Sequence, residues 1–126
     1  MSVTRISLIA LAVLATPAAF AAEKADVANG KTLFEQRCGI CHSTVKDGGP
    51  VLGPNMVGLI GRKAGSDANF PTYTPALKAY AVKWNAKTLS EFLENPMVKV
   101  PGTMMPMSLP DAKERADVVA YMATIK

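Results

Sequence analysis

The sequence predicts an all-α fold in which helices are joined by long loops. Apolar residues recur at helical spacing in several segments, and no segment shows the alternating pattern of a strand. The stretches between these segments are rich in glycine and proline, which interrupt helices. At 126 residues, the chain has a length typical of one domain.

Residues 1–21 are expected to be a cleaved secretory signal peptide and not part of the fold. Residues 1–5 form a short, positively charged segment, and residues 6–15 are apolar except Ser7. Residues 19–21 place alanine at the two positions that signal peptidase recognises. The apolar run is about ten residues long, whereas a membrane-spanning helix needs roughly 20. The alternative is an uncleaved membrane anchor. Cleavage after Ala21 leaves a domain of residues 22–126, exported to a bacterial periplasm.

Asp26 is expected to cap a first helix that runs to about Cys41. Gly30 lies inside this helix, where glycine costs roughly 1 kcal/mol relative to alanine. We therefore expect another helix to approach the backbone closely at Gly30. The apolar positions of the first helix are near helical spacing: Val27, Leu33, Phe34, Cys38 and Cys41.

Residues 43–70 form a predicted loop of roughly 28 residues, interrupted by several glycines and prolines. A loop of this length is unusual inside a compact domain unless it has something to wrap around. We therefore expect it to fold over a large buried cofactor.

Two further helices are predicted from their starting residues. Thr74 followed by Pro75 is typical of a helix start, and this helix is expected to end near Val82. Asn85 is expected to cap the next helix, which stops at Asn95-Pro96. Its inward-facing residues are expected to be Leu89, Phe92 and Leu93.

The last helix is expected to be capped by Ser108, with Pro110 and Asp111 in its first turn. The segment before it, residues 100–106, holds two prolines and a glycine and is expected to be extended. The last helix carries one apolar stripe, at Val118, Tyr121, Met122 and Ile125.

The charge of the chain is mild. It has 14 basic and 10 acidic residues, for a net charge of +4. There is no basic run and no interleaving of aromatic and basic residues, so nucleic acid is not an expected partner.

The chemistry is concentrated in Cys38-Gly39-Ile40-Cys41-His42, the attachment signature of c-type haem. Positions i, i+3 and i+4 of a helix share one face. Each thiol can therefore form a thioether with one haem vinyl group while the imidazole meets the iron. Three alternatives are weaker: a redox Cys-x-x-Cys needs a βαβ context, a structural zinc site needs four ligands, and a plain disulfide needs no adjacent histidine.

The second axial ligand of the iron is expected to be a methionine, because the chain has only one histidine. Met122 fits the stripe of the last helix and is interpreted as a core residue. Met104, Met105 and Met107 lie on the proline-stiffened segment before that helix, which can hold a thioether against a metal. Residue type and spacing do not choose among these three.

The sequence resembles the class I c-type cytochromes, specifically the short mitochondrial-like type and its bacterial counterparts. The resemblance covers nearly all of residues 26–126 and implies the cytochrome c fold, in which four to five helices and long loops wrap around one covalently bound haem c. The motifs that carry it are Cys38-Gly39-Ile40-Cys41-His42, Gly53-Pro54-Asn55, Gly58-Leu59-Ile60-Gly61-Arg62-Lys63, Tyr73-Thr74, Trp84, Leu93-Glu94-Asn95-Pro96, Pro101-Gly102-Thr103-Met104-Met105 and Arg115-Ala116-Asp117.

The resemblance also implies the roles of single residues. Met105 matches the axial ligand, so the iron is expected to be held by His42 and Met105. The carbonyl of Pro54 is expected to accept a hydrogen bond from the far imidazole nitrogen of His42. The residues that match those hydrogen-bonding the haem propionates are Arg62, Tyr73, Thr74 and Trp84.

Some positions depart from the family pattern. Phe92 stands where the family often has tyrosine, and Leu77 replaces a usual asparagine near the propionates. Three positions around the exposed haem edge, where relatives often carry lysine, and one where they carry an aromatic residue are apolar here. These departures argue against docking by a ring of lysines; the four apolar residues are Met97, Val98, Met104 and Met107.

The residues and the resemblance together imply a monohaem electron carrier and not an enzyme. An iron with both axial positions filled is closed to substrate, so electrons are expected to pass through the exposed haem edge. One alternative is a peroxidase-like or gas-binding protein, which needs a vacant sixth position. Another is a dedicated electron-accepting subunit of a periplasmic dehydrogenase, which the apolar haem edge favours.

The expected partners are redox proteins such as a membrane oxidase, a cytochrome complex or a periplasmic dehydrogenase, as in a respiratory chain. The protein is expected to be a monomer unless it is bound to a dedicated partner. After signal cleavage, no stable membrane insertion is expected.

Overall fold

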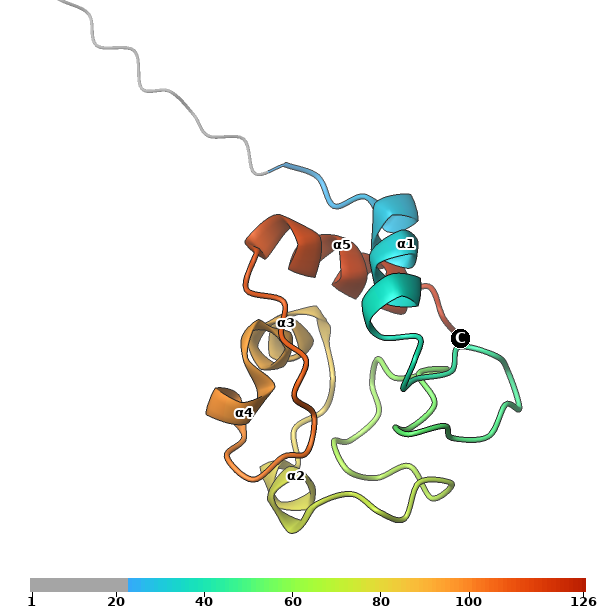
Figure 1. The fold of residues 1–126 in the computed structure, drawn as a ribbon, viewed down its shortest axis with the longest axis vertical. Coiled ribbons are helices and arrows are strands. Elements are labelled where there is room, and N and C mark those ends of the chain that lie inside the picture. Colours follow the sequence, from blue (N-terminus) through green and yellow to red (C-terminus); the bar gives the residue numbers. More distant parts are fainter. Residues whose placement is uncertain (1–22) are drawn as a thin grey trace, which may run out of the picture.

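The computed structural model describes residues 23–126, and the predicted signal peptide at residues 1–21 lies outside them. The elements of the described part are all helices, which confirms the all-α prediction (Figure 1). The only strand-like feature there is an isolated bridge between Lys63 and Lys83. The helices are α1 (Val27–Arg37), α2 (Pro75–Tyr80), α3 (Ala86–Glu94), α4 (Pro96–Lys99) and α5 (Ala112–Met122).

Helix α1 begins as predicted but ends earlier. The Asp26 side chain accepts hydrogen bonds from the amides of Ala28 and Asn29, which makes it the N-cap. The helix ends at Arg37 because the amides of both Cys38 and Gly39 bind the Phe34 carbonyl, at 2.7 and 2.8 Å. The predicted extension to Cys41 is therefore wrong, and the haem-attachment motif lies in the turn after the helix.

Helices α1 and α5 cross in close contact at Gly30, as the sequence indicated (Figure 1). A Cβ atom at Gly30 would lie 1.9 Å from the carbonyl oxygen of Asp117, which no side chain could tolerate. Further along the crossing, the rings of Phe34 and Tyr121 pack with their centroids 5.6 Å apart. The crossing therefore requires glycine at this position.

Helix α2 begins at the predicted cap but ends before Val82. Thr74 accepts a hydrogen bond from the Leu77 amide, and Pro75 is the first helical residue. The helix stops at Tyr80 because Ala81 adopts a left-handed conformation with φ 51°. The chain then pairs with an earlier loop, where the Ala64 amide donates to the Val82 carbonyl at 2.8 Å.

Helix α3 agrees with its prediction, but a short helix after it was missed. Asn85 forms a capping box with Thr88, and the three predicted inward residues, Leu89, Phe92 and Leu93, are buried. Asn95 ends α3 and also caps α4, in which Pro96 is the first residue. The Asn95-Pro96 pair therefore both ends α3 and begins α4.

The predicted start of α5 at Ser108 is wrong. The N-cap is Asp111, whose side chain accepts from the Glu114 amide at 2.8 Å. The helix cannot start earlier because Leu109 is fully buried and its amide donates to the Leu93 carbonyl at 2.7 Å. This contact holds the preceding segment against the end of α3 in a non-helical conformation.

The buried carboxylate of Asp117, in α5, binds the N-terminal end of α1. It accepts from the Asp26 amide at 2.7 Å, the Asn29 side-chain amide at 2.8 Å and the Lys113 ammonium group at 2.9 Å. The hydrogen bond from Lys113, followed by those from Asp26 and Asn29, lowers the pKa of Asp117 to about 2. The N-terminus of α1 is thus anchored to α5 by charge-assisted hydrogen bonds.

Replacing Asp117 with asparagine is expected to remove a pH-dependent part of the stability. Because the pKa of Asp117 is depressed in the folded state, its contribution is fully present above the ordinary pKa of about 4 and is lost as the pH falls towards about 2. Over that range, the free energy of unfolding measured in denaturant should fall more steeply for the wild type than for Asp117→Asn. Asp47→Asn, at an exposed acid, is the control and should keep the wild-type slope. Equal slopes in wild type and Asp117→Asn would contradict this role.

Candidate functional site

A cavity of about 570 Å³ opens between the helices and the long loop that follows α1. Its walls are mostly apolar, and it is far larger than the small voids of an ordinary packed core. The apolar residues that line it include Phe34, Met56, Leu59, Phe70, Leu77, Leu89, Phe92, Leu93 and Met122. These residues come from α1, the long loop, α2, α3 and α5, so the whole fold encloses this space.

Both cysteines of the attachment motif line the cavity, and their thiols are not joined to each other. Cys38 is buried, and burial raises the pKa of its thiol to about 11. The amides of Cys41 and His42 both donate to the Cys38 carbonyl, at 3.0 and 2.9 Å. This turn keeps the helix-like spacing that the motif needs, although α1 itself has ended. Within residues 23–126, no three His, Cys, Asp or Glu side chains lie close enough together to hold a metal ion.

The ring of His42 is held in one orientation by a hydrogen bond of 2.8 Å between its Nδ1 atom and the Pro54 carbonyl. A carbonyl can only accept, so Nδ1 carries the proton and Nε2 keeps its lone pair. Burial, the largest effect, lowers the pKa of His42, while the bond to Pro54 opposes this shift. His42, which lines the cavity, therefore offers a neutral nitrogen to a metal.

Gly53 has a role that sequence reasoning missed. A Cβ atom at this position would lie 2.5 Å from Cε1 of His42, so only glycine lets the loop backbone pass behind the ring. The amide of Gly53 also donates to the Cys41 carbonyl at 2.8 Å. The loop is thus tied directly to the attachment motif.

The three candidate methionines all line the cavity but differ in exposure. Met105 is half-buried and packs against the core, whereas Met104 is 84% exposed and Met107 is 40% exposed. In Figure 1, the segment after α4 that carries these residues and the turn after α1 lie on opposite sides of the centre of the domain. Of the three, Met105 has the burial that a residue facing the interior requires.

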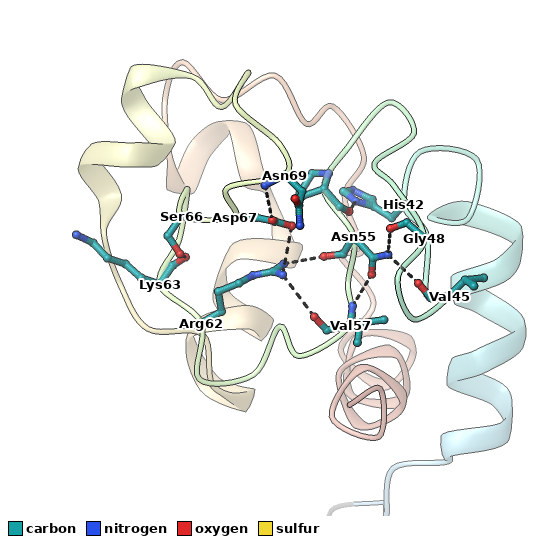
Figure 2. A network of polar contacts seen from close by, with 11 residues as sticks. His42, Val45, Gly48, Asn55, Val57, Arg62, Lys63, Ser66, Asp67 and Asn69 are labelled. Carbon is teal, nitrogen blue, oxygen red and sulfur yellow. Dashed lines mark hydrogen bonds and ion pairs between the residues drawn. The ribbon is translucent and has the colours of Figure 1, made fainter.

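A network of polar contacts surrounds Arg62, and the part of the cavity that Arg62 lines is called its polar end (Figure 2). Arg62 donates to the carbonyls of Asn55 at 2.8 Å and Val57 at 3.4 Å, and lies 3.5 Å from the Asp67 carboxylate. Asn55 in turn donates to the carbonyls of Val45 and Gly48. Sequence reasoning found Arg62 but missed its contacts with Asn55, Val57 and Asp67, because these are set by the path of the loop.

The other predicted propionate ligands, Tyr73, Thr74 and Trp84, also line the cavity. Burial raises the pKa of Tyr73, while nearby Arg62 acts in the opposite direction. The Thr74 hydroxyl accepts from the Leu77 amide at 3.3 Å, which leaves its own proton free to donate. Trp84 is buried beside Phe92 with ring centroids 5.2 Å apart, and no hydrogen bond within residues 23–126 involves its indole nitrogen.

The features of the cavity fit a haem. Two neighbouring thiols and a neutral imidazole lie on a single turn, and a half-buried thioether comes from another segment. Hydrogen-bond donors interrupt the mostly apolar walls. Such walls suit the porphyrin, and the donors suit its carboxylates. Fold and site together therefore define a c-type haem protein of the all-α class.

Comparisons with known proteins agree with this conclusion. The family model described as Cytochrome c matches residues 27–126. A cytochrome c from Gibberella zeae is 46% identical over 98 residues, which cover 77% of this chain and 92% of the relative. A cytochrome c2 from Rhodomicrobium vannielii is 37% identical over 125 residues, which cover 98% of this chain and 97% of the relative. The chain belongs to the cytochrome c family, as a class I c-type cytochrome.

Membership of this family establishes that the protein binds one covalent haem c. It is a monohaem electron carrier and not an enzyme. Within the described part of the chain, no helix has both the length and the apolar character needed to cross a bilayer.

Proposed function

We propose that this protein carries single electrons between redox partners outside the cytoplasm of a bacterium, with His42 and Met105 as the axial ligands of its haem iron. The observation that carries the proposal is the His42 ring, held by Pro54 so that a neutral nitrogen remains for the iron. Cys38 and Cys41, on the same turn, are the residues to which the haem would be attached.

The residues of the site favour outer-sphere electron transfer. When bound, the haem supplies a one-electron iron couple. Gly53 and Pro54 keep the imidazole from turning, and the proline-stiffened segment before α5 holds Met105 against the core. His42 and Met105 would then hold the iron in the same way in either oxidation state. Electron exchange would need little rearrangement, and no position would be left for a substrate, which a peroxidase-like or gas-binding protein needs.

The polar end of the cavity is proposed to hold the haem carboxylates. Three of the five guanidinium N–H groups of Arg62 are used by Asn55, Val57 and Asp67, so two remain for a further acceptor. The free hydroxyl proton of Thr74 and the indole N–H of Trp84 add two more donors. The hydroxyl of Tyr73, also lining the cavity, completes this set.

Replacing Met105 with leucine is expected to remove the sulfur ligand from the iron. The ferric protein should then lose the weak far-red absorption band that sulfur ligation produces, and its midpoint potential should fall, because a thioether ligand raises it. Met104→Leu is the matched control, since Met104 is 84% exposed, and it should keep both properties. If Met105→Leu kept the band and Met104→Leu lost it, the ligand assignment would be wrong.

Export to the periplasm is part of the proposal. Residues 1–21 support export, because a positive segment is followed by an apolar segment and then by small residues, as in a signal peptide. The match to the cytochrome c2, which extends over 98% of this chain, adds support because it reaches into this segment. The mass of the protein isolated from the periplasm should correspond to residues 22–126 plus one haem. Recovery in the membrane fraction with residues 1–21 attached would contradict cleavage.

A second candidate role is a dedicated electron-accepting subunit of a periplasmic dehydrogenase, in place of a free shuttle that meets a membrane oxidase or cytochrome complex. It is favoured by the exposure of four apolar residues at positions where relatives often carry lysine or an aromatic residue. Such exposure is typical of a surface that a partner covers. These residues are Met97, Val98, Met104 and Met107, which are 56%, 73%, 84% and 40% exposed.

The subunit role predicts a partner that stays bound during purification from the native periplasm. The double change Val98→Lys and Met104→Lys should release that partner, because lysine is costly to bury in an apolar interface. Val27→Lys, at an exposed residue in the first turn of α1, is the control and should not release it. A wild-type protein that elutes alone at native expression levels would exclude this role and leave the free shuttle.

A further inference from the structure

Asp67 is a carboxylate near the polar end of the cavity for which the proposed function has no use. Its side chain is only 10% exposed. The Oδ1 atom accepts from the Asn69 amide at 2.9 Å, and the Oδ2 atom lies 3.5 Å from Nη1 of Arg62 (Figure 2). An acid this well covered is rarely found without a partner, and here the partner is Arg62.

Asp67 contacts Arg62 without lining the cavity itself, whereas Arg62 does line it. The carbonyls of Asn55 and Val57 hold the guanidinium from the loop. Asp67 can therefore act on the cavity through Arg62, and its charge also acts on Tyr73, another residue that lines the cavity.

We propose that Asp67 is a positioning residue which, by sharing Arg62 with the haem carboxylate that Arg62 meets, lowers the reduction potential of the haem. The inference rests on the proposed function, because it needs a haem carboxylate at the polar end. Reduction adds an electron to the iron, and a nearby uncompensated negative charge opposes that addition. With Asp67 present, part of the positive charge of Arg62 is neutralised in a poorly solvated place, where charges interact strongly.

A purely structural role for Asp67 makes the opposite prediction. If the carboxylate served only to hold Arg62 in place, its loss would let the guanidinium move away, and the potential would fall or stay unchanged. Asparagine keeps an Oδ1 acceptor for the Asn69 amide, but it removes the charge and replaces the Oδ2 acceptor of Arg62 with an NH2 group, so it tests both roles at once. The sign of the shift therefore decides between charge sharing and scaffolding.

The test compares midpoint potentials of the haem-loaded protein in Asp67→Asn, Asp67→Glu and Asp47→Asn. We expect Asp67→Asn to raise the potential, with a several-fold larger equilibrium constant for reduction, and Asp67→Glu to return it towards the wild-type value. Asp47→Asn removes the same charge from an exposed site in the same long loop and should leave the potential unchanged, since water and salt screen exposed charges. A double mutant with Arg62→Gln should show that the two effects do not add.

An unchanged or lowered potential in Asp67→Asn, with haem attached and the far-red band intact, would overturn the role of Asp67 and leave the proposed function standing. An equal rise in Asp47→Asn, or additive effects in the double mutant, would also overturn it. By contrast, a wild-type protein that carries no haem, or lacks the far-red band, would contradict the proposed function itself. The two failures are thus distinguished by the spectrum.

Discussion

The close crossing of α1 and α5 is the constraint on which the rest of the structure depends. The backbones meet at Gly30, where a side chain would collide with the carbonyl of Asp117. The Asp117 carboxylate then holds the amide of Asp26, just before α1. Because α1 is fixed in this way at its start, the turn that ends it has a defined place, and the two thiols and His42 reach the same cavity.

The long loop after α1 completes the site. Gly53 and Pro54 fix the orientation of the His42 imidazole. The next residue, Asn55, belongs to the polar network around Arg62. One stretch of three residues therefore links His42, the proposed iron ligand, to the end of the cavity where carboxylates are proposed to lie. The remaining walls are apolar, so the few charges near the cavity act in a poorly solvated place where their effects are large.

Local patterns predicted those parts of the fold that depend on neighbours in the chain. The caps at Asp26, Thr74 and Asn85 bind amides two or three residues away, so they are visible in the sequence. The start of α5 was misjudged because the decisive contact is between Leu109 and Leu93, which are distant in sequence. Arg62 and Asp67 are close in sequence, but their contact depends on the conformation of an irregular loop, which residue types alone do not predict.

By itself, the sequence determined the class of fold and the haem-attachment motif, since these depend on residue identity and short spacing, and it predicted a methionine as the second ligand. It narrowed the sulfur ligand to three methionines, and the family resemblance selected one. Only the tertiary structure decided which loop atoms hold His42, which of the three methionines is half-buried against the core, and which acid contacts Arg62. The physical reason is that these contacts depend on the path of an irregular loop around the cavity, which residue type and short spacing do not set.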